Sequence, residues 1–276
     1  MNQYEEIVSC IKNADAILVS ASNGFSITEG LHLFAENQAF DELFGDIKHK
    51  YGIRNILQGS FINWPSEEEK WGYLSRLISH YSGSYTGSAV MDDLKTVIGN
   101  TPYFIVTSNG EGHFTLAGFD EERIYEIEGN WLTMQCAHAC HNTLYKTMEH
   151  IKEMAASEKG GKVPTELVPH CPKCGSPMQI HVPLDEYFIP NTAAQRRFEQ
   201  FLQQYHGKKL VVLELGIGWR NQLIKAPLMS LVHREPNATY VTINKGEIYI
   251  PNNIYEKSFG VDGDLASALR EIARKL

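Results

Sequence analysis

The sequence has no long hydrophobic run, no internal repeat, no low-complexity segment and no excess of positive charge. Crossing a bilayer takes about 20 apolar residues in succession, so we expect no membrane partner. Twenty-five Lys and Arg stand against 33 Asp and Glu, a formal net charge of −8. Proteins that bind phosphate backbones concentrate basic residues on one face, so we expect no nucleic-acid partner. With 276 residues, 43% of them hydrophobic, the chain can still bury a proper core.

The opening residues also lack the features of a secretory signal peptide. The run Met1-Asn2-Gln3-Tyr4-Glu5-Glu6 has neither a basic start nor an apolar stretch behind it. We therefore expect a cytoplasmic protein. Thiols stay reduced in that compartment, which makes disulfides between neighbouring cysteines the less favoured interpretation.

Cysteine is scarce, but its placement is informative. Four of the five cysteines form two close pairs, Cys136 with Cys140 and Cys171 with Cys174. Each pair spans a tight turn that can direct two thiolates at one point, and four thiolates complete the tetrahedral shell that zinc prefers in closed structural sites. We predict a structural zinc ion on these four residues. The alternatives are two disulfides, four unrelated thiols, or one sulfur replaced by a nearby histidine, namely His138, His141 or His170.

Short, nearly continuous apolar runs predict strands buried on both faces of a sheet, and helical patterns separate them. This alternation predicts an α/β fold, a Rossmann-like parallel sheet with helices on both faces. We assign the sheet to a domain of residues 1–130 and 207–276, with a small four-cysteine zinc-binding module at 131–182 and a connecting segment and helix at 183–206. The expected strands are 16–21, 103–106, 210–213 and 239–243, and the expected helices are 4–12, 89–98, 193–205 and 264–276.

Polar or glycine-rich turns follow all four predicted strands. In a parallel sheet the ligand crevice lies beyond the carboxyl ends of the strands, where these turns would meet. The backbone amides of small-residue turns can hold phosphate oxygens without a lysine, which suits a dinucleotide. The glycine fingerprint of dinucleotide-binding folds is absent, so each turn by itself is weak evidence. The turns are residues 20–26, 107–113, 216–218 and 244–246.

Taken together, these residues resemble the sirtuin family, NAD-dependent deacylases and ADP-ribosyltransferases with a Rossmann domain and a four-cysteine zinc module. The resemblance runs nearly end to end. Residues 20–22 are similar to the family's Gly-Ala-Gly, 30–34 to Gly-Ile-Pro-Asp-Phe, 107–112 to Thr-Gln-Asn-Ile-Asp-Gly and 216–218 to Gly-Thr-Ser. The resemblance implies that NAD is bound by Ser20, Ala21, Ser22, Gly24, Phe34, Ser108, Asn109, Gly216, Ile217, Gly218, Asn244, Gly263 and Asp264.

The chain departs from the usual sirtuin pattern at two positions. Ala35 stands where the family has an arginine, and Glu128, in Glu-Ile-Glu-Gly, stands where it has the histidine base of Glu-Leu-His-Gly. A carboxylate with a pKa near about 4.3 is a weaker base at neutral pH than a histidine near about 6.5. It can still stabilise the positive charge that develops on a ribose as nicotinamide leaves. This combination is most similar to the class M, macrodomain-linked sirtuins.

The resemblance implies a role for each residue of the expected catalytic centre. Asn109 would orient the nicotinamide ribose and a water, and Glu111, in place of an aspartate, would hold the nicotinamide amide or order the same loop. Phe34 would cover the ribose face. Glu128 would act on the reacting ribose, although an acidic residue at a strand end is usually a surface charge. His113 and His32 are the alternative bases.

Class M similarity implies mono-ADP-ribosylation of a protein acceptor, such as a lipoyl or H-type carrier protein, and a functional link to a macrodomain hydrolase. Three other activities remain open from the sequence. They are an NAD-dependent deacylase with Glu128 or a histidine as base, an NAD hydrolase, and a non-catalytic module that binds NAD or ADP-ribose. Serines at positions 20 and 22 would either crowd the pyrophosphate or hydrogen-bond to it.

Overall fold

The computed structural model describes residues 2–276, and its centre is a sheet of six parallel strands. The order across the sheet is β3-β2-β1-β7-β8-β9, with β1 in the interior between β2 and β7. All neighbouring pairs run parallel, so every strand ends at the same edge. The strands are β1 Ala16–Ala21, β2 Tyr103–Thr107, β3 Ile124–Glu126, β7 Leu210–Leu215, β8 Thr239–Asn244 and β9 Ser258–Asp262.

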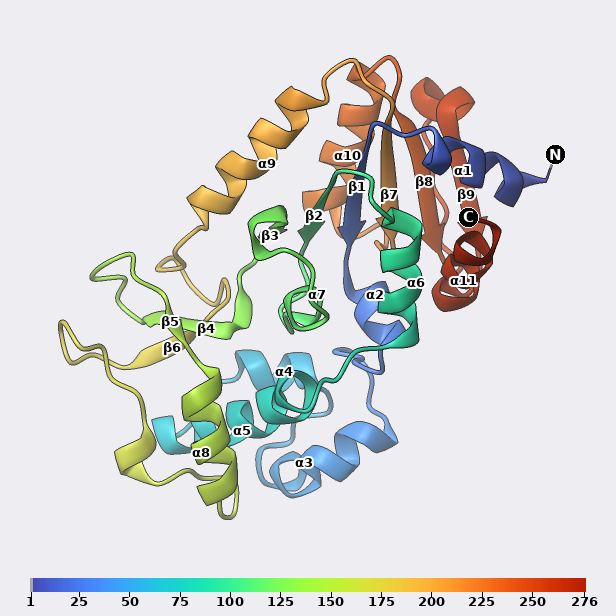
Figure 1. Ribbon diagram of the computed structural model, residues 1–276. Helices are drawn as coiled ribbons and strands as arrows, with labels where there is room; N and C mark the ends of the chain where they lie inside the picture. The colour runs from blue at the N-terminus through green and yellow to red at the C-terminus, as the bar shows by residue number, and fades with distance from the viewer. Residues whose placement is uncertain (1) are drawn as a thin grey trace.

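Helices cover both faces of this sheet because its central strands are apolar on both sides (Figure 1). Alternate residues of a strand point to opposite faces. Ile17 and Val19 belong to one hydrophobic core, with α1 Gln3–Lys12, α6 Ala89–Ile98 and α11 Leu265–Lys275. Ala16 and Leu18 belong to another, with α9 Thr192–Gln204 and α10 Gln222–Arg234. The predicted α/β fold with a parallel sheet is confirmed.

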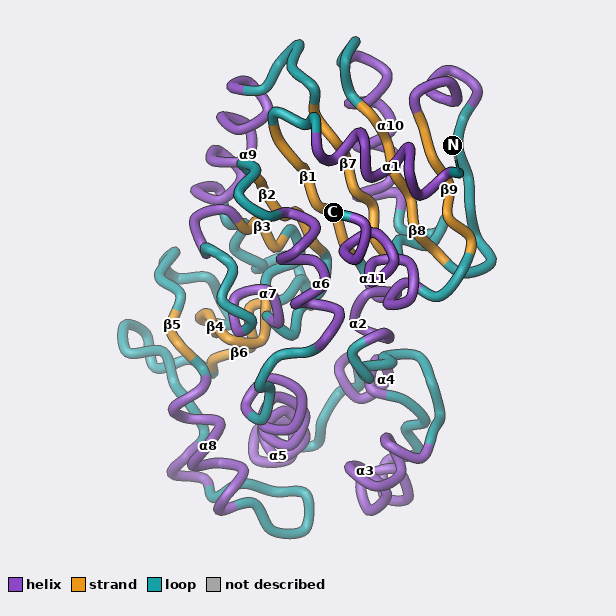
Figure 2. Tube along the Cα trace, turned by 45° about the vertical axis from the view of Figure 1, so that its right-hand side comes forward, coloured by secondary structure: helices purple, strands orange, loops and turns teal. Residues whose placement is uncertain are grey.

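A second, smaller part of the molecule has its own core, built from two stretches of chain that are far apart in sequence. The first contains α3 Gln38–Tyr51, α4 Ile56–Phe61, α5 Glu67–Ile78 and the π-helix η1 Ser79–Gly83. The second contains a three-stranded antiparallel sheet, with β4 Asn130–Cys136 between β5 Tyr145–Lys146 and β6 Met178–His181, and helix α8 Met148–Ser157. Figure 2 shows both below the large sheet. Their shared core includes Phe44, Trp71, Leu77, Ile151 and Ile180.

This core divides the chain differently from the predicted boundaries. We assigned all of residues 1–130 to the sheet domain, but residues 31–78 pack with the zinc module. The shorter elements complete the fold: α2 Asn23–Thr28, α7 His113–Leu116, η2 Glu121–Arg123, η3 Thr165–Leu167 and η4 Asn252–Lys257. The four predicted strands and four predicted helices are present within one or two residues of their expected bounds. Within residues 2–276, every helix is too short or too polar to span a membrane.

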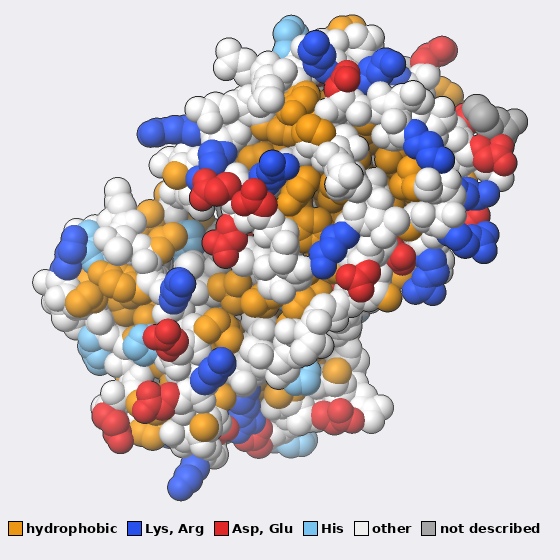
Figure 3. All heavy atoms as spheres, in the orientation of Figure 1, with side chains coloured by type: hydrophobic (Ala, Val, Ile, Leu, Met, Phe, Trp, Pro, Cys, Tyr) orange, Lys and Arg blue, Asp and Glu red, His pale blue; other side chains and the backbone are white. Residues whose placement is uncertain are grey.

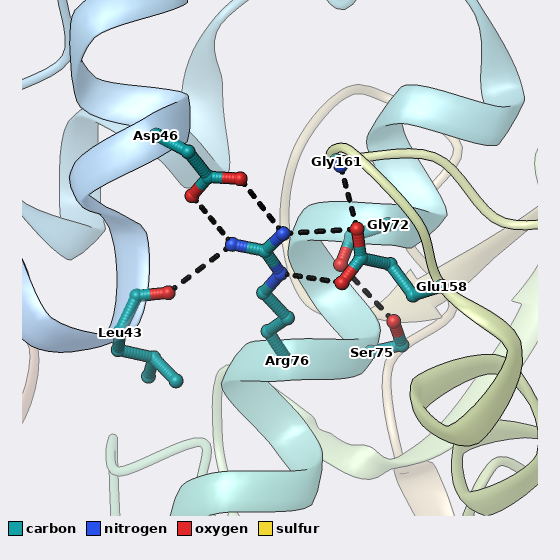
Figure 4. A network of polar contacts seen from close by, with 7 residues as sticks. All are labelled: Leu43, Asp46, Gly72, Ser75, Arg76, Glu158 and Gly161. Atoms are coloured by element: carbon teal, nitrogen blue, oxygen red, sulfur yellow. Dashed lines mark hydrogen bonds and ion pairs between the residues drawn. The ribbon is translucent and has the colours of Figure 1, made fainter.

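Arg76 of α5 ties the two stretches of the smaller part together (Figure 4). Its guanidinium forms a two-pronged contact with Asp46 of α3, at 2.6 and 2.9 Å, and another with Glu158, which follows α8, at 2.8 and 2.9 Å. The nitrogen Nη1 also donates to the carbonyl of Leu43. The Glu158 side chain is only 10% exposed. Paired, two-pronged contacts of this kind are the stronger class of protein ion pair.

We expect Arg76→Met to lower the free energy of unfolding by about 2 kcal/mol, because Glu158 would be left buried without its partner. The same substitution at Arg270, a largely exposed residue paired with Asp93 at 3.6 Å, should change the stability by no more than about 0.5 kcal/mol. Urea unfolding followed by circular dichroism measures both. Equal losses in the two variants would contradict the role of the network.

Candidate functional site

The turns that follow β1, β2, β7 and β8 meet at the carboxyl edge of the sheet, as predicted. Two of them touch through their backbones, since the Gly24 amide donates to the Gly216 carbonyl at 2.9 Å. A Cβ added to Gly24 would lie 2.6 Å from the Gly216 Cα, and one added to Gly216, where φ is +63°, would lie 2.5 Å from the Gly24 carbonyl carbon. Only glycine fits at both positions. The contact fixes the spacing of the two turns.

The serines of this edge point at protein groups. Ser20 is fully buried in β1, and its hydroxyl donates to the Val106 carbonyl at 3.2 Å. The Ser22 and Ser108 hydroxyls are 3.0 Å apart, and the Asn221 side-chain amide donates to both, at 2.9 and 3.0 Å. This triangle joins three turns across the crevice. Asn221 was not among the predicted residues, although it directly precedes α10 in the turn after β7.

Asn109 is the least satisfied polar side chain of the edge. It is 3% exposed, and in residues 2–276 neither its Oδ1 nor its Nδ2 has a hydrogen-bond partner. Its backbone is fixed, since its amide donates to the Thr107 hydroxyl, which donates in turn to the Ala21 carbonyl. Leaving a buried amide group unpaired costs about 1–3 kcal/mol. An orphaned donor and acceptor at the carboxyl edge of a parallel sheet suit a ligand rich in hydroxyl groups.

Glu111 lies on the same loop but is enclosed by protein. Its carboxylate accepts from the Ser26 hydroxyl of α2 at 2.7 Å, and burial raises the pKa of this carboxyl. Beside it, His113 has Nδ1 2.8 Å from Glu29 and Nε2 2.8 Å from the Tyr81 carbonyl. Burial disfavours the charged ring, but the contact with Glu29, the charge of Glu111 and the Tyr81 carbonyl together outweigh it and raise the pKa of His113. With an acceptor at each nitrogen, His113 is a poor candidate for a base.

Glu128 lies on a backbone segment that is hydrogen-bonded to the segment of Asn109. Thr107 accepts a hydrogen bond from the Ile127 amide and Gly110 accepts one from the Trp131 amide, so residues 127–131 run next to 107–110. The Glu128 carboxyl is partly buried, and that burial raises its pKa. The next residue, Gly129, has φ +66°, and a Cβ there would lie 2.0 Å from the His181 carbonyl oxygen. The zinc module therefore fixes the path of the chain past Glu128.

Glu126, two residues earlier, is a carboxyl group that sequence reasoning did not single out. It ends β3 opposite Thr107 and accepts a hydrogen bond from the Asn130 side chain. Burial raises the pKa of Glu126 to about 7, and the negative charge of Glu111 contributes. Glu126, Glu128 and Glu111 thus form a group of carboxyls with raised pKa values around the loop of Asn109.

The remaining predicted residues lie along the edge at different distances from Asn109. Phe34 is half exposed and its carbonyl accepts from Asn55 just before α4. Asn244 ends β8, where its carbonyl accepts from the Gly263 amide. The Asp264 carboxylate caps α11, and its hydrogen bonds with Ser267 lower its pKa. The helix cap by itself explains an aspartate at position 264, and the predicted contact of Asp264 with NAD stays a prediction.

The four cysteines converge at one end of the antiparallel sheet. Cys136 Sγ lies 3.6 Å from Cys174 Sγ, Cys140 Sγ lies 3.6 Å from Cys171 Sγ, and all four sulfurs are within 4.8 Å of one another. Tetrahedral zinc with bonds of about 2.3 Å separates its thiolates by about 3.8 Å. The neighbouring histidines each contact an oxygen atom, His138 that of Ser176, His141 that of Tyr145 and His170 the Val168 carbonyl. His141 Nε2 also lies 3.8 Å from Cys171 Sγ, farther than the 3.6 Å that separates Cys171 Sγ from Cys140 Sγ. The cluster therefore has the geometry of a four-thiolate zinc site.

Comparisons with known proteins agree with this architecture. No known protein-family model matches the chain. A Staphylococcus aureus protein named protein ADP-ribosyltransferase is 31% identical over 278 residues, which cover 99% of this chain and 87% of the relative. A Fusarium oxysporum f. sp. cubense protein named probable bifunctional ADP-ribose hydrolase/ADP-ribosyltransferase is 26% identical, over 94% of this chain and 46% of the relative.

Solved structures share the fold at much lower identity. A Sir2 homologue in complex with NAD superimposes with a TM-score of 0.68 and 14% identity, covering 98% of this chain and 93% of its own. A mutant Sir2 homologue in complex with ADP-ribose gives a TM-score of 0.65, also at 14% identity, covering 100% and 96%. At this identity the likeness shows that the fold is shared.

The raised pKa of Glu126 predicts a pH-dependent stability. The folded state holds this proton with a pKa of about 7, against 4.5 for a free carboxyl, so its stabilising effect is present at low pH and is lost as the pH rises through 7. Glu126→Gln carries no charge at any pH. As the pH rises from 5 to 8, the unmodified protein should lose about 2 kcal/mol of unfolding free energy that the Glu126→Gln variant does not lose.

Urea unfolding at both pH values measures this difference. Glu256→Gln, which removes an exposed carboxyl of η4, is the matched control and should show the same pH profile as the unmodified protein. A parallel pH profile for Glu126→Gln would show that Glu126 titrates normally.

Proposed function

The chain belongs to the sirtuin family, and on that basis we propose that it is an NAD-dependent protein mono-ADP-ribosyltransferase. The observation that carries the proposal is Asn109, a buried side chain with both amide atoms unpaired. It lies where the turns of four parallel strands meet, which is where the fold binds ligands. The name of the Staphylococcus aureus relative, identical at 31% of positions over nearly the whole chain, supports transfer of ADP-ribose as the reaction.

The residues present fit a dinucleotide. The paired glycine turns bring backbone amides close to any pyrophosphate at the edge, and the Ser22–Ser108–Asn221 triangle keeps the serine side chains from crowding it. When bound, NAD supplies the bond between nicotinamide and ribose that is broken in the reaction. Asn109 would then pair with the hydroxyls of that ribose, and Phe34 would cover it from the side of α4.

Glu128 would place negative charge beside the ribose. A carboxylate there stabilises the positive charge that develops as nicotinamide leaves, and it can take the proton that a protein nucleophile loses. Its raised pKa makes it a better base than a free glutamate, although still weaker than a histidine at neutral pH. Because a base with a raised pKa could also take the ribose proton that deacylation requires, deacylation is the second candidate activity.

We propose a protein acceptor, and a lipoylated carrier as its first candidate. An apolar groove next to Glu128 supports an acceptor that carries a chain-like apolar group such as lipoyl. Ile127, the residue before Glu128, forms part of its wall. Figure 3 shows hydrophobic side chains exposed over the sheet between α9 and α10, where this groove runs. Its lining is Val106, Tyr125, Ile127, Phe198, Leu223, Ile224, Pro227 and Leu228. The bifunctional name of the Fusarium relative, about half of whose length lies outside the match, supports a link to an ADP-ribose hydrolase.

Incubating the protein with NAD and lipoylated or acylated carrier protein, then recording mass spectra, tests the proposal. ADP-ribose on the carrier supports it. O-acyl-ADP-ribose indicates a deacylase, free ADP-ribose indicates a hydrolase, and unchanged NAD indicates a binding module; each of these three outcomes would overturn the proposed transferase.

Two substitutions test the proposed catalytic residues. Asn109→Ala should lower the rate of nicotinamide release about 100-fold, because the ribose would lose its orienting contact. Glu128→Gln should lower it by a similar factor through loss of the charge. Glu121→Gln is the control for an exposed carboxyl on the same segment and should retain full activity. Unchanged turnover in both Asn109→Ala and Glu128→Gln would remove these residues from the mechanism.

We also propose that Cys136, Cys140, Cys171 and Cys174 bind a structural zinc ion, which closes its shell with four thiolates and leaves no position for substrate. Cys174→Ser should abolish zinc content, measured by atomic absorption, and lower the melting temperature, because metal binding contributes folding free energy. Cys10→Ser, at a half-buried thiol of α1 outside the cluster, should retain its zinc. Full zinc content in Cys174→Ser would contradict the site.

A further inference from the structure

A buried ion pair lies directly beneath the turn that follows β7. Glu214 of β7 and Lys225 of α10 are both 0% exposed. The Lys225 ammonium donates to Glu214 Oε1 and, at 3.1 Å, to the carbonyl oxygen of Ile217. Glu214 also accepts from the Thr242 hydroxyl at 2.8 Å and from the Tyr240 hydroxyl. Every charged atom of the pair is therefore satisfied by protein groups.

Buried ion pairs of this kind are a weak source of stability. Removing two charges from water costs several kcal/mol for each ion, and a well-packed apolar pair of the same volume is often as stable or more so. Lys225 is also in the first turns of α10, where the helix dipole disfavours a cation. The residues level with Glu214 on the neighbouring strands are the uncharged Ser20 and Thr242. Stability alone is therefore a weak explanation for the pair.

The contact with Ile217 indicates another role. In a trans peptide unit the carbonyl and the following N–H point in opposite directions. Lys225 holds the Ile217 carbonyl toward the interior, so the N–H of Gly218 points outward, toward the carboxyl edge of the sheet. In residues 2–276 the Gly218 N–H has no acceptor. The following amide, that of Trp219, also faces outward and donates to the exposed Glu247 carboxylate at 3.0 Å.

We propose that the Glu214–Lys225 pair is a positioning device for the turn of residues 216–218, which presents the Gly218 amide to the oxygen atoms of the bound dinucleotide. Lys225 acts through the Ile217 carbonyl and does not touch the ligand. The inference rests on the proposed function, since it takes NAD or ADP-ribose as the ligand. It assigns a binding role to two residues that lie behind the crevice.

The test must separate positioning from simple stability. Lys225→Met alone leaves Glu214 buried and unpaired, so that variant should be destabilised for a trivial reason. The double variant Glu214→Gln/Lys225→Met removes both charges; the glutamine carbonyl can accept from the Thr242 hydroxyl, and its NH2 group can donate to the Tyr240 hydroxyl. We expect its melting temperature to be higher than that of Lys225→Met. The ADP-ribose affinity should stay low, because nothing then holds the Ile217 carbonyl inward.

Calorimetry with ADP-ribose and initial rates of nicotinamide release provide the readout. The double variant should bind ADP-ribose about tenfold more weakly, the loss expected for one hydrogen bond, and show a raised KM for NAD with kcat little changed. Arg76→Met, which breaks the charged network of the smaller part (Figure 4) and leaves every contact of this turn in place, is the control. It should lose stability and keep the ADP-ribose affinity of the unmodified protein.

A double variant that binds ADP-ribose within twofold of the unmodified protein would overturn the positioning role and leave the proposed function standing. Failure of the unmodified protein to bind ADP-ribose or to release nicotinamide would overturn the proposed function, and the positioning role with it. A tenfold loss of affinity in Arg76→Met as well would reduce the effect to general destabilisation and would also overturn the inference.

Discussion

The backbone contact between Gly24 and Gly216 is the constraint on which the site depends. It holds the turns after β1 and β7 together at the centre of the sheet, with less space between them than a methyl group needs. Because both turns are fixed, the side chains that follow them have fixed positions too. Ser22 reaches Ser108 and Asn221, and the Ile217 carbonyl reaches Lys225. The crevice is thus shaped by the sheet itself, before any loop outside it contributes.

The second constraint comes from the smaller part of the molecule. Two stretches of chain pack into one core, one between β1 and β2 in the sequence and the other after β3. The Arg76 network joins them. The antiparallel sheet of this core passes so close to Gly129 that no side chain fits there. Glu128 is therefore located by the zinc module as well as by β3. The proposed zinc ion, more than one element away from the crevice, would in this way affect the position of the Glu128 side chain.

The sequence predicted the sheet well because its central strands are apolar on both faces, as Leu18 and Val19 illustrate. It also predicted the cysteine cluster, since close pairs of thiols have few other purposes. The association of α3 and α5 with the zinc module was not predictable, because an amphipathic helix does not reveal what its apolar face contacts. Glu214 was the missed signal: a charged residue inside the otherwise apolar strand Leu-Val-Val-Leu-Glu-Leu requires a buried partner.

In the proposed transferase, the carboxyl groups around Asn109 would favour chemistry at a ribose without a histidine base. Burial raises the pKa values of Glu111, Glu126 and Glu128, which means that the surroundings resist negative charge on these groups. Positive charge developing nearby relieves that penalty, since each ionised carboxylate then gains a partner in a poorly solvated site. In the proposed mechanism this arrangement would stabilise the departure of nicotinamide, and the raised pKa of Glu128 would also let it take the proton that the acceptor nucleophile loses. The proposed transferase chemistry would then depend on the burial of the glutamate that stands where the family has its histidine.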